Sequence, residues 1–239
     1  MPPSTSNSTP ANKLLASLPE PQYQRLTPYL EEVSLPVGQV LYEPGEIIKY
    51  VYFPNQAMVS LVSILEDGST AEVGMVGNDG IVGYPVFLGG NRTTHRAIVQ
   101  IEDTAMKMNA EILKTEFNRG ETLQKLLLRY TQALITQVSQ TAACNRHHPL
   151  EERLARWLLT AHDYSLSDEL PLTQEFISDM LGTRRASVTV AAGMLQQARI
   201  IRYNRGRITI LNRQALEATA CECYSVVKRE YQRLLDSGL

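Results

Sequence analysis

Short apolar runs dominate the chain between about residues 33 and 101. The runs are rich in Val, Ile and Tyr, and the breaks between them carry turn-forming residues, as at Pro44-Gly45, Asp67-Gly68 and Asn78-Asp79-Gly80. Strands that recur every ~8–12 residues with such breaks are typical of an antiparallel sandwich or barrel. The preceding stretch, 12–30, predicts short helices interrupted by prolines.

Beyond about residue 109 the apolar positions follow a helical period. The stretch 120–145 holds no proline, and its apolar positions recur at steps of four and three: Leu123, Leu127, Tyr130, Leu134 and Val138. A helix of ~25 residues is ~38 Å long, and so narrow a stripe is typical of a coiled-coil seam. We therefore predict that this helix pairs with a second copy of the chain. The alternative is a helix packed on the chain's own strands.

The segment 171–211 predicts two short helices followed by a hairpin. Thr173 can cap the first helix, and Gly182 can end it in a left-handed turn. A second helix follows at once, and two short strands then flank the turn signal at 204–206. Two helices joined by a short turn with glycine form a helix-turn-helix, and the hairpin adds a wing. A further amphipathic helix is expected over 150–164, after Pro149.

A helix-turn-helix places the start of its second helix against the base edges of DNA. Arginine pairs there with guanine O6 and N7, whereas Ser and Thr bond a base edge or a phosphate. Arg205 and Arg207 lie at the tip of the hairpin, where they could reach a phosphate. The residues predicted at the start of the second helix are Arg184, Arg185, Ser187 and Thr189.

Charge supports this interpretation only after it is divided along the chain. All 239 residues together carry a formal net charge of -2, which taken alone argues against nucleic acid as a partner. The stretch 171–213 holds seven arginines against Glu175 and Asp179, so it carries +5 and the rest of the chain -7. Arginine forks onto phosphate and guanine better than lysine does. The distribution therefore favours DNA over the alternative, an ordinary solvated face.

These motifs resemble the cyclic-AMP receptor and fumarate-nitrate regulator (Crp/Fnr) transcription factors over about residues 12–225. The resemblance rests on the strand-rich run, the long helix, LEERLARWLL, and LTQEFISDMLGTRRASVTVAAGMLQQARII followed by GRITI. It implies an α+β chain with an antiparallel β-roll of the jelly-roll type, a dimerisation helix and a C-terminal winged helix-turn-helix. It also places Thr173 and Gln174 near the phosphates. Ala186 stands where many members carry an acidic residue, so their half-site preference is not transferred.

The resemblance implies four consecutive parts. They are a disordered tail over 1–11, a sensor domain over 12–118, a dimerisation helix over 119–146 and a DNA-binding domain over 147–239, which includes a C-terminal helix. The implied partners are double-stranded DNA, a second copy of the chain, RNA polymerase and a small-molecule effector.

The sensor lacks the family's cyclic-nucleotide cassette, in which a Glu binds the ribose and an Arg-Ser/Thr pair follows about ten residues later. Tyr84-Pro85 stands where Glu-Leu would be, and Arg92-Thr93 comes about two residues early. Arg96 is no better spaced. The effector is therefore unknown and cyclic AMP is not favoured. Tyr84, Arg92, Thr93 and Arg96 are the candidate effector contacts, and for Tyr84 the favoured alternative is a half-buried strand residue.

Cysteine usage predicts no metal site. The N-terminal half has no cysteine for an iron–sulfur cluster, no haem signature is present, and Cys221-x-Cys223 is shorter than the usual C-x2-C zinc pair. We interpret Cys144, Cys221 and Cys223 as packed small residues, with a redox role as the alternative. His147-His148 is interpreted as a polar junction between domains.

Other classes of protein find little support in the sequence. There is no GxSxG, P-loop or HExxH motif, so we expect no enzyme activity. Three cysteines, an odd number, favour a reducing cytoplasm over a disulfide framework, and no membrane span or secretory signal is expected. Two alternatives to an effector-controlled regulator remain. They are a small-molecule-binding module whose C-terminal helices dock a protein, and a ligand-free scaffold that is constitutively active on DNA.

Overall fold

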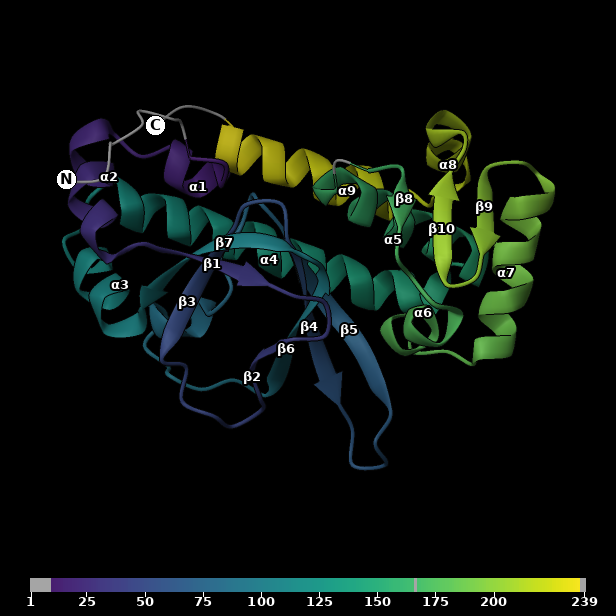
Figure 1. Cartoon of the computed structure of the whole chain (residues 1–239), viewed down its shortest axis with the longest axis horizontal. Helices are drawn as coiled ribbons and strands as arrows, with labels where there is room; N and C mark the ends of the chain where they lie inside the picture. Colours follow the sequence, from purple (N-terminus) through teal and green to yellow (C-terminus); the bar gives the residue numbers. More distant parts are fainter. Residues whose placement is uncertain (1–9, 166, 237–239) are drawn as a thin grey trace.

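Strands β1–β7 form two antiparallel sheets, which we call the β-roll, in the computed structural model, which describes residues 10–165 and 167–236 (Figure 1). Residues 1–9 of the predicted disordered tail lie outside the described residues. One sheet has the order β1-β7-β3 and comprises Glu31–Leu35, Asp103–Asn109 and Tyr50–Pro54. The other has the order β2-β6-β4-β5 and comprises Val40–Tyr42, His95–Ile101, Met58–Ile64 and Thr70–Val76.

Strand β4 shows why this β-roll is buried on both sides. Successive side chains of a strand point to opposite faces. Val59 and Leu61 point into the β-roll, where they join the first hydrophobic core. Met58 and Val62 point the other way and join a second core, which belongs to the C-terminal half of the chain. The two halves are therefore packed together through β4, which contributes to both cores, and through Met75 of β5 and Ile101 of β6, which also belong to the second core.

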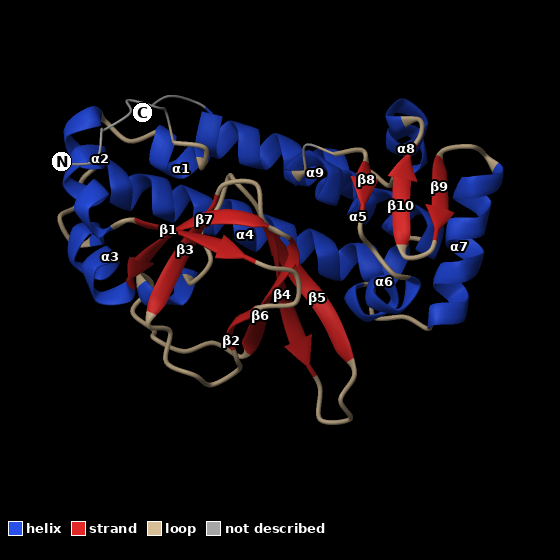
Figure 2. Ribbon diagram, viewed as in Figure 1, coloured by secondary structure: helices blue, strands red, loops and turns tan. Residues whose placement is uncertain are grey.

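The long helix α4 (Thr122–His147) lies along the β-roll, and the short helices α1 (Lys13–Ala16), α2 (Glu20–Leu26) and α3 (Ala110–Phe117) accompany it (Figure 2). Its predicted self-pairing seam is wrong at four of five positions. Leu123, Leu127, Tyr130 and Leu134 are at most 4% exposed and belong to the first core. The β-roll covers this face of α4, so it is closed to a second copy.

A winged domain follows, formed by α5–α8 and a three-stranded sheet of order β8-β10-β9. Trp157 of α5, fully buried, packs beside Phe176 of α6 at the centre of the second core. The bounds are Leu150–Tyr164 for α5, Glu169–Leu170 for β8, Gln174–Met180 for α6, Arg185–Gln197 for α7, Ile201–Asn204 for β9, Arg207–Ile210 for β10 and Arg213–Thr219 for α8. The predicted fold, an antiparallel β-roll, a long helix and a winged helix-turn-helix, is confirmed.

The last helix, α9 (Cys223–Tyr231), returns along α4 and continues as a π-helical turn over Gln232–Asp236 (Figure 1). Tyr231 and Leu234 belong to the first core, together with the β-roll. The C-terminal helix therefore shares its packing with the long helix, although the sequence assigned it to the C-terminal domain.

Gly77 sets how closely the two halves approach. A Cβ atom on Gly77 would lie 2.0 Å from the ring of Tyr164, which belongs to α5. Such a contact is far inside van der Waals distance, so only a glycine admits the ring here. The glycines near residues 74–80 were predicted to make turns, and the Gly80 N–H does donate to the Gly77 carbonyl. Gly77 also serves the packing of one domain on the other.

Candidate nucleic-acid interface

The helix-turn-helix forms from the local signals that the sequence carries. The Thr173 hydroxyl accepts a hydrogen bond from the Phe176 N–H at 3.1 Å and so caps α6, as predicted. Gly182 has φ +58°, the left-handed conformation that ends the helix. Arg184 is then the N-cap residue of α7, and Val188 and Leu195 turn that helix inward. The start of α7 is thereby held at the surface.

Two arginines extend from this start without intramolecular partners. Arg184 and Arg185 are exposed. Within residues 10–165 and 167–236, neither guanidinium makes a hydrogen bond or an ion pair. An unpaired guanidinium keeps all five of its N–H donors available for an external anion or a base edge. These two side chains are thus free for the contacts that the sequence predicted.

Further along α7 the exposed face becomes apolar. Val190 is 64% exposed and Met194 43% exposed, one helical turn apart. Between them lies Gly193, whose side-chain position has no other atom within 4 Å. These three residues were not predicted from the sequence, although their positions alternate with the buried face of α7, formed by Val188, Ala191, Ala192 and Leu195. Apolar side chains in this position suit the methyl group of thymine.

Thr189 and Gln174 connect the two helices of the motif. The Thr189 hydroxyl lies 2.8 Å from Gln174 Oε1 and 3.1 Å from the Arg185 carbonyl oxygen, and its one proton serves these acceptors. Ser187 is half-buried. Thr189 and Gln174 are therefore already engaged in holding α6 against α7. Arg184 and Arg185, in contrast, have no such intramolecular role.

The hairpin between β9 and β10 is a two-residue turn. Asn204 pairs with Arg207, and the two residues between them both have positive φ, +45° for Arg205 and +78° for Gly206. This is the pattern of a type I′ turn, which favours Asn or Gly at both places. Arg205 is exposed and, among the described residues, unpaired. Arg207 instead forms an ion pair with Glu169 of β8 at 2.5 Å.

The predicted effector residues lie in one part of the β-roll, where both arginines already have a partner within the chain. The Thr93 hydroxyl accepts a hydrogen bond from the His95 N–H at 3.2 Å, and burial raises the pKa of Tyr84. Arg92 donates to the Gly45 carbonyl at 2.5 Å, and Arg96 forms an ion pair with Glu43 at 2.8 Å. Arg92 and Thr93 line only an open surface depression. A phosphate there would have to displace these partners.

A more enclosed cavity, of about 290 Å³, lies where the β-roll meets α4, α5 and α9. Its wall includes the carboxyl groups of buried Glu72 and half-buried Asp79, and the cationic side chains of Arg156 and Lys228. Burial raises the pKa of Glu72 to about 7, opposed by hydrogen bonds from Ser60 and from Trp157 Nε1 and by the charge of Arg156. Burial likewise raises the pKa of Asp79 to about 6.

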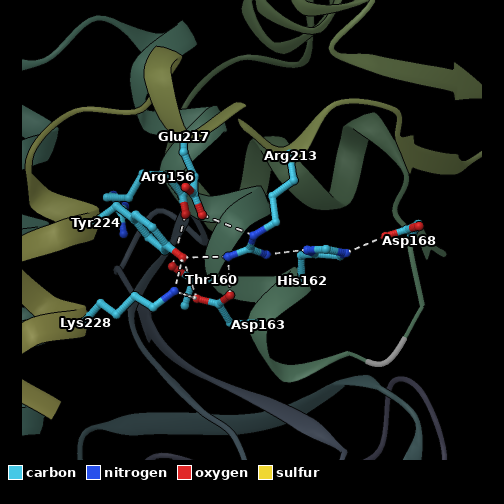
Figure 3. A network of polar contacts seen from close by, with 9 residues as sticks. All are labelled: Arg156, Thr160, His162, Asp163, Asp168, Arg213, Glu217, Tyr224 and Lys228. Carbon is cyan, nitrogen blue, oxygen red and sulfur yellow. Dashed lines mark hydrogen bonds and ion pairs between the residues drawn. The ribbon is translucent and has the colours of Figure 1, made fainter. Parts of the chain in front are cut away.

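A polar network beside this cavity ties α5, α8 and α9 together (Figure 3). Arg213, the first residue of α8, forms an ion pair with Asp163 at 2.5 Å, and Tyr224 of α9 donates to the same carboxylate at 2.7 Å. Arg213 also contacts His162 Nδ1, and His162 Nε2 lies 2.7 Å from Asp168. The winged domain and the returning helix are thus held together by ion pairs and hydrogen bonds as well as by packing.

Comparison with known proteins matches two parts of the chain to family models. Residues 32–119 match the cyclic nucleotide-binding domain, and residues 152–219 match the Crp-like helix-turn-helix domain. The global nitrogen regulator of Synechococcus elongatus is 22% identical over 188 residues, which is 75% of this chain and 85% of that protein. That of a Nostoc strain is 22% identical over 182 residues, 72% of this chain and 82% of that protein.

Solved structures show the same fold. FixK2 from Bradyrhizobium japonicum superimposes with a TM-score of 0.68 at 19% identity, covering 80% of this chain and 98% of that one. TTHB099, a transcriptional regulator of the CRP family from Thermus thermophilus, gives a TM-score of 0.66 at 22% identity, covering 79% and 96%. Among the described residues, no helix is both long and apolar enough to cross a membrane.

Proposed function

Because the chain belongs to the Crp/Fnr family of DNA-binding transcription regulators, which are not enzymes, we propose that it binds a two-fold symmetric operator as a homodimer. The observation that carries this proposal is the pair of exposed, unpaired arginines at the start of α7, Arg184 and Arg185. Such a regulator acts where the chromosome lies, in the cytoplasm.

Each part of the surface has a distinct role in this proposal. Arg184 and Arg185 hydrogen-bond guanine, and Val190 with Met194 packs on thymine methyl groups. Arg205 at the wing contacts a phosphate, which adds affinity without sequence preference. Ala186 is exposed and has no acceptor for the amino group of cytosine, which an acidic side chain would bind. The half-site should therefore depend on guanines and thymines.

The dimer uses the outer face of α4 instead of the predicted seam. Leu128 is 48% exposed, Ile135 61% and Val138 38%, and Ala142 continues the stripe. Leu128, Ile135 and Ala142 are seven residues apart, the repeat of a coiled-coil seam. Apolar side chains of this size seldom line up on a free surface, and a second α4 in the same position would cover them. Val138 is the one residue shared with the predicted seam.

An effector would act through the enclosed cavity beside α4. This cavity is lined by residues of the β-roll, the long helix, α5 and the returning helix α9, so a ligand there would contact all four together. Its mixed lining of carboxyl and cationic groups suits a polar molecule. A ligand that prefers one arrangement of the dimer shifts the population towards it. Binding would raise the melting temperature of the full chain.

Selection of bound duplexes from a random DNA pool tests the proposal. We expect a palindromic consensus with half-sites one helical turn apart, roughly 34 Å. Ile135→Glu should abolish the dimer in sedimentation analysis and weaken binding to the selected duplex. Val37→Glu, at a residue 51% exposed on the β-roll, is the matched control and should leave both unchanged.

Two results would overturn the proposal. A pool that yields no enrichment and no salt-dependent affinity would favour the alternative in which the C-terminal helices dock a protein. An enriched, asymmetric site bound by a single chain would refute the dimer while leaving the helix-turn-helix assignment in place.

A further inference from the structure

Three cysteines and one histidine converge where α4 ends and α9 begins. Cys144 and His148 lie one turn apart at the end of α4, and Cys221 and Cys223 flank the start of α9. Their sulfur and imidazole nitrogen atoms all lie within 4.8 Å of one another. All three cysteines are buried and form a cluster separate from the two hydrophobic cores.

The distances suit four ligands around a single ion. Cys144 Sγ lies 3.5 Å from Cys221 Sγ, and Cys223 Sγ lies 3.5 Å from His148 Nδ1. A tetrahedral zinc ion with Zn–S bonds of about 2.3 Å has neighbouring ligand atoms about 3.8 Å apart. Thiolates that bind separate irons of an iron–sulfur cluster must stand farther apart than ligands of one ion. We infer that Cys144, His148, Cys221 and Cys223 bind one zinc ion.

Neighbouring side chains already orient these ligands. His148 Nε2 lies 3.3 Å from Glu222 Oε2, so the Nε2–H group can donate a hydrogen bond to the carboxylate and leave the Nδ1 lone pair facing the sulfur atoms. Carboxylate–histidine–zinc arrangements of this kind fix the tautomer of the ligand. Gln140 Nε2 donates to Cys223 Sγ at 3.3 Å. Packed small residues, the interpretation made from sequence, would require no such partners.

The charge around the cluster is also suitable. Three thiolates and one zinc ion leave a net charge of about -1. The Arg156 guanidinium lies beside Cys144, and Arg153 interacts electrostatically with Cys144 and Cys221. A buried negative centre needs such a cation nearby. The Nε atoms of both arginines are buried and, in the described structure, without a hydrogen-bond partner.

The site would fasten the returning helix to the long helix. Cys144 and Cys221 are 77 residues apart in sequence, and the metal would connect the end of α4 to the turn before α9. Four protein ligands leave no open position, which is the mark of a structural rather than a catalytic zinc site. Linear spacing hid the site, because two ligands come from one helical turn of α4 and two from a turn that follows the wing. The signal in the sequence was the i, i+4 pair of Cys144 and His148 on a predicted helix.

Metal analysis of the full-length, untagged chain tests the site. We expect about one zinc per chain by inductively coupled plasma mass spectrometry. His148→Ala should reduce bound zinc at least tenfold after dialysis, and His147→Ala, one residue earlier and exposed, is the matched control and should retain it. Replacement with cobalt should give the visible bands and the thiolate charge-transfer band of a tetrahedral site.

Each remaining outcome decides against the site. Intact-mass analysis that shows a Cys144–Cys221 disulfide in freshly reduced, zinc-supplemented protein would overturn the proposal. Iron in place of zinc, or equal zinc in the His148→Ala and parent chains, would do the same. If His148→Ala fails to fold, chelation of the parent answers the question, because loss of a structural zinc must lower its melting temperature.

Discussion

Two sets of arginines in this chain differ in what surrounds them. On the β-roll, Arg92 donates to a backbone carbonyl and Arg96 pairs with Glu43. On α7, Arg184 and Arg185 have no partner among the described residues. An external phosphate must compete with the existing partners in the first set, whereas in the second it gains the whole interaction.

This difference explains why two pairs of arginines have different prospects as anion sites. A guanidinium that already has a partner gains less when a ligand arrives, because the ligand must share it with that partner or exchange one hydrogen bond for another. An exposed, unpaired one releases counterions and forms new charge-assisted bonds. The sequence alone does not distinguish the two sets of arginines. They differ only in their contacts in the folded chain.

The largest expected effect comes from removing both free arginines. Arg184→Ala with Arg185→Ala should weaken binding to the selected duplex by on the order of a hundredfold or more, because each bidentate guanine contact contributes about 1–3 kcal/mol of discrimination. Fluorescence anisotropy at fixed salt measures it. Arg92→Ala with Arg96→Ala is the matched control and should change the dissociation constant less than about twofold. Equal losses of DNA affinity in the two double variants would show that the paired and unpaired arginines do not differ in their contribution to binding.

Substitution of buried Glu72, which lies between the β-roll and α5, should give the next largest effect, on the pH dependence of stability. Its pKa is raised from 4.5 to about 7, so the folded state binds the proton more tightly than the unfolded state does. The contribution to stability is complete below pH 4.5 and is lost as the pH rises to about 7. Glu72→Gln should flatten this decline by roughly 2–3 kcal/mol.

Denaturant unfolding between pH 4 and 8 measures the effect of Glu72→Gln. Asp79, whose pKa is also raised by burial, adds a decline of the same sign that should remain in this variant. Glu66→Gln, in the exposed hairpin between β4 and β5, should leave the profile unchanged. A parent chain whose stability rises steadily across this range would contradict the assignment.

Arg205 should show opposite effects on stability and binding. Its φ of +45° suits asparagine better than arginine, so Arg205→Asn should stabilise the fold by about 0.5–1 kcal/mol. It should weaken all duplexes alike and reduce the slope of log K against log salt by about 0.9. Arg199→Asn is the matched control, because Arg199 has φ +57°, is exposed and lies at the far end of α7. That variant should gain stability without losing affinity.

Features fixed by neighbouring residues could be predicted from the sequence. The cap at Thr173, the left-handed Gly182 and the hairpin at Asn204 each depend on a few adjacent positions, and each is confirmed. The antiparallel strands and the long helix were predicted from turn spacing and from the helical period, whereas the β-roll was implied by the family resemblance. Binary patterns of this kind report the local geometry directly.

Features fixed by distant contacts could not be predicted. The period of α4 showed that Leu127 and Tyr130 lie on an apolar face, but the β-roll that covers this face comes from residues far away in sequence. The outer stripe through Leu128 and Ile135 is weaker and was overlooked. The grouping of His148 with three cysteines could not be predicted for the same reason, since linear spacing carries no information about a helix that packs back along α4.

Arg207 gives the most sensitive test of whether an ion pair within the chain limits an arginine's contact with DNA. It belongs to the wing, yet it pairs with Glu169 as the arginines of the β-roll pair with their own partners. Both side chains are exposed, 64% and 46%, so the pair contributes at most about 1 kcal/mol. Glu169→Gln should free Arg207 and strengthen DNA binding by up to about fivefold. Arg207→Gln removes the acceptor's partner, so adding Glu169→Gln to it should give no further gain if the effect passes through Arg207. A gain of the same size in both backgrounds would mean that Glu169 acts only by repelling phosphates, and that pairing does not limit this arginine.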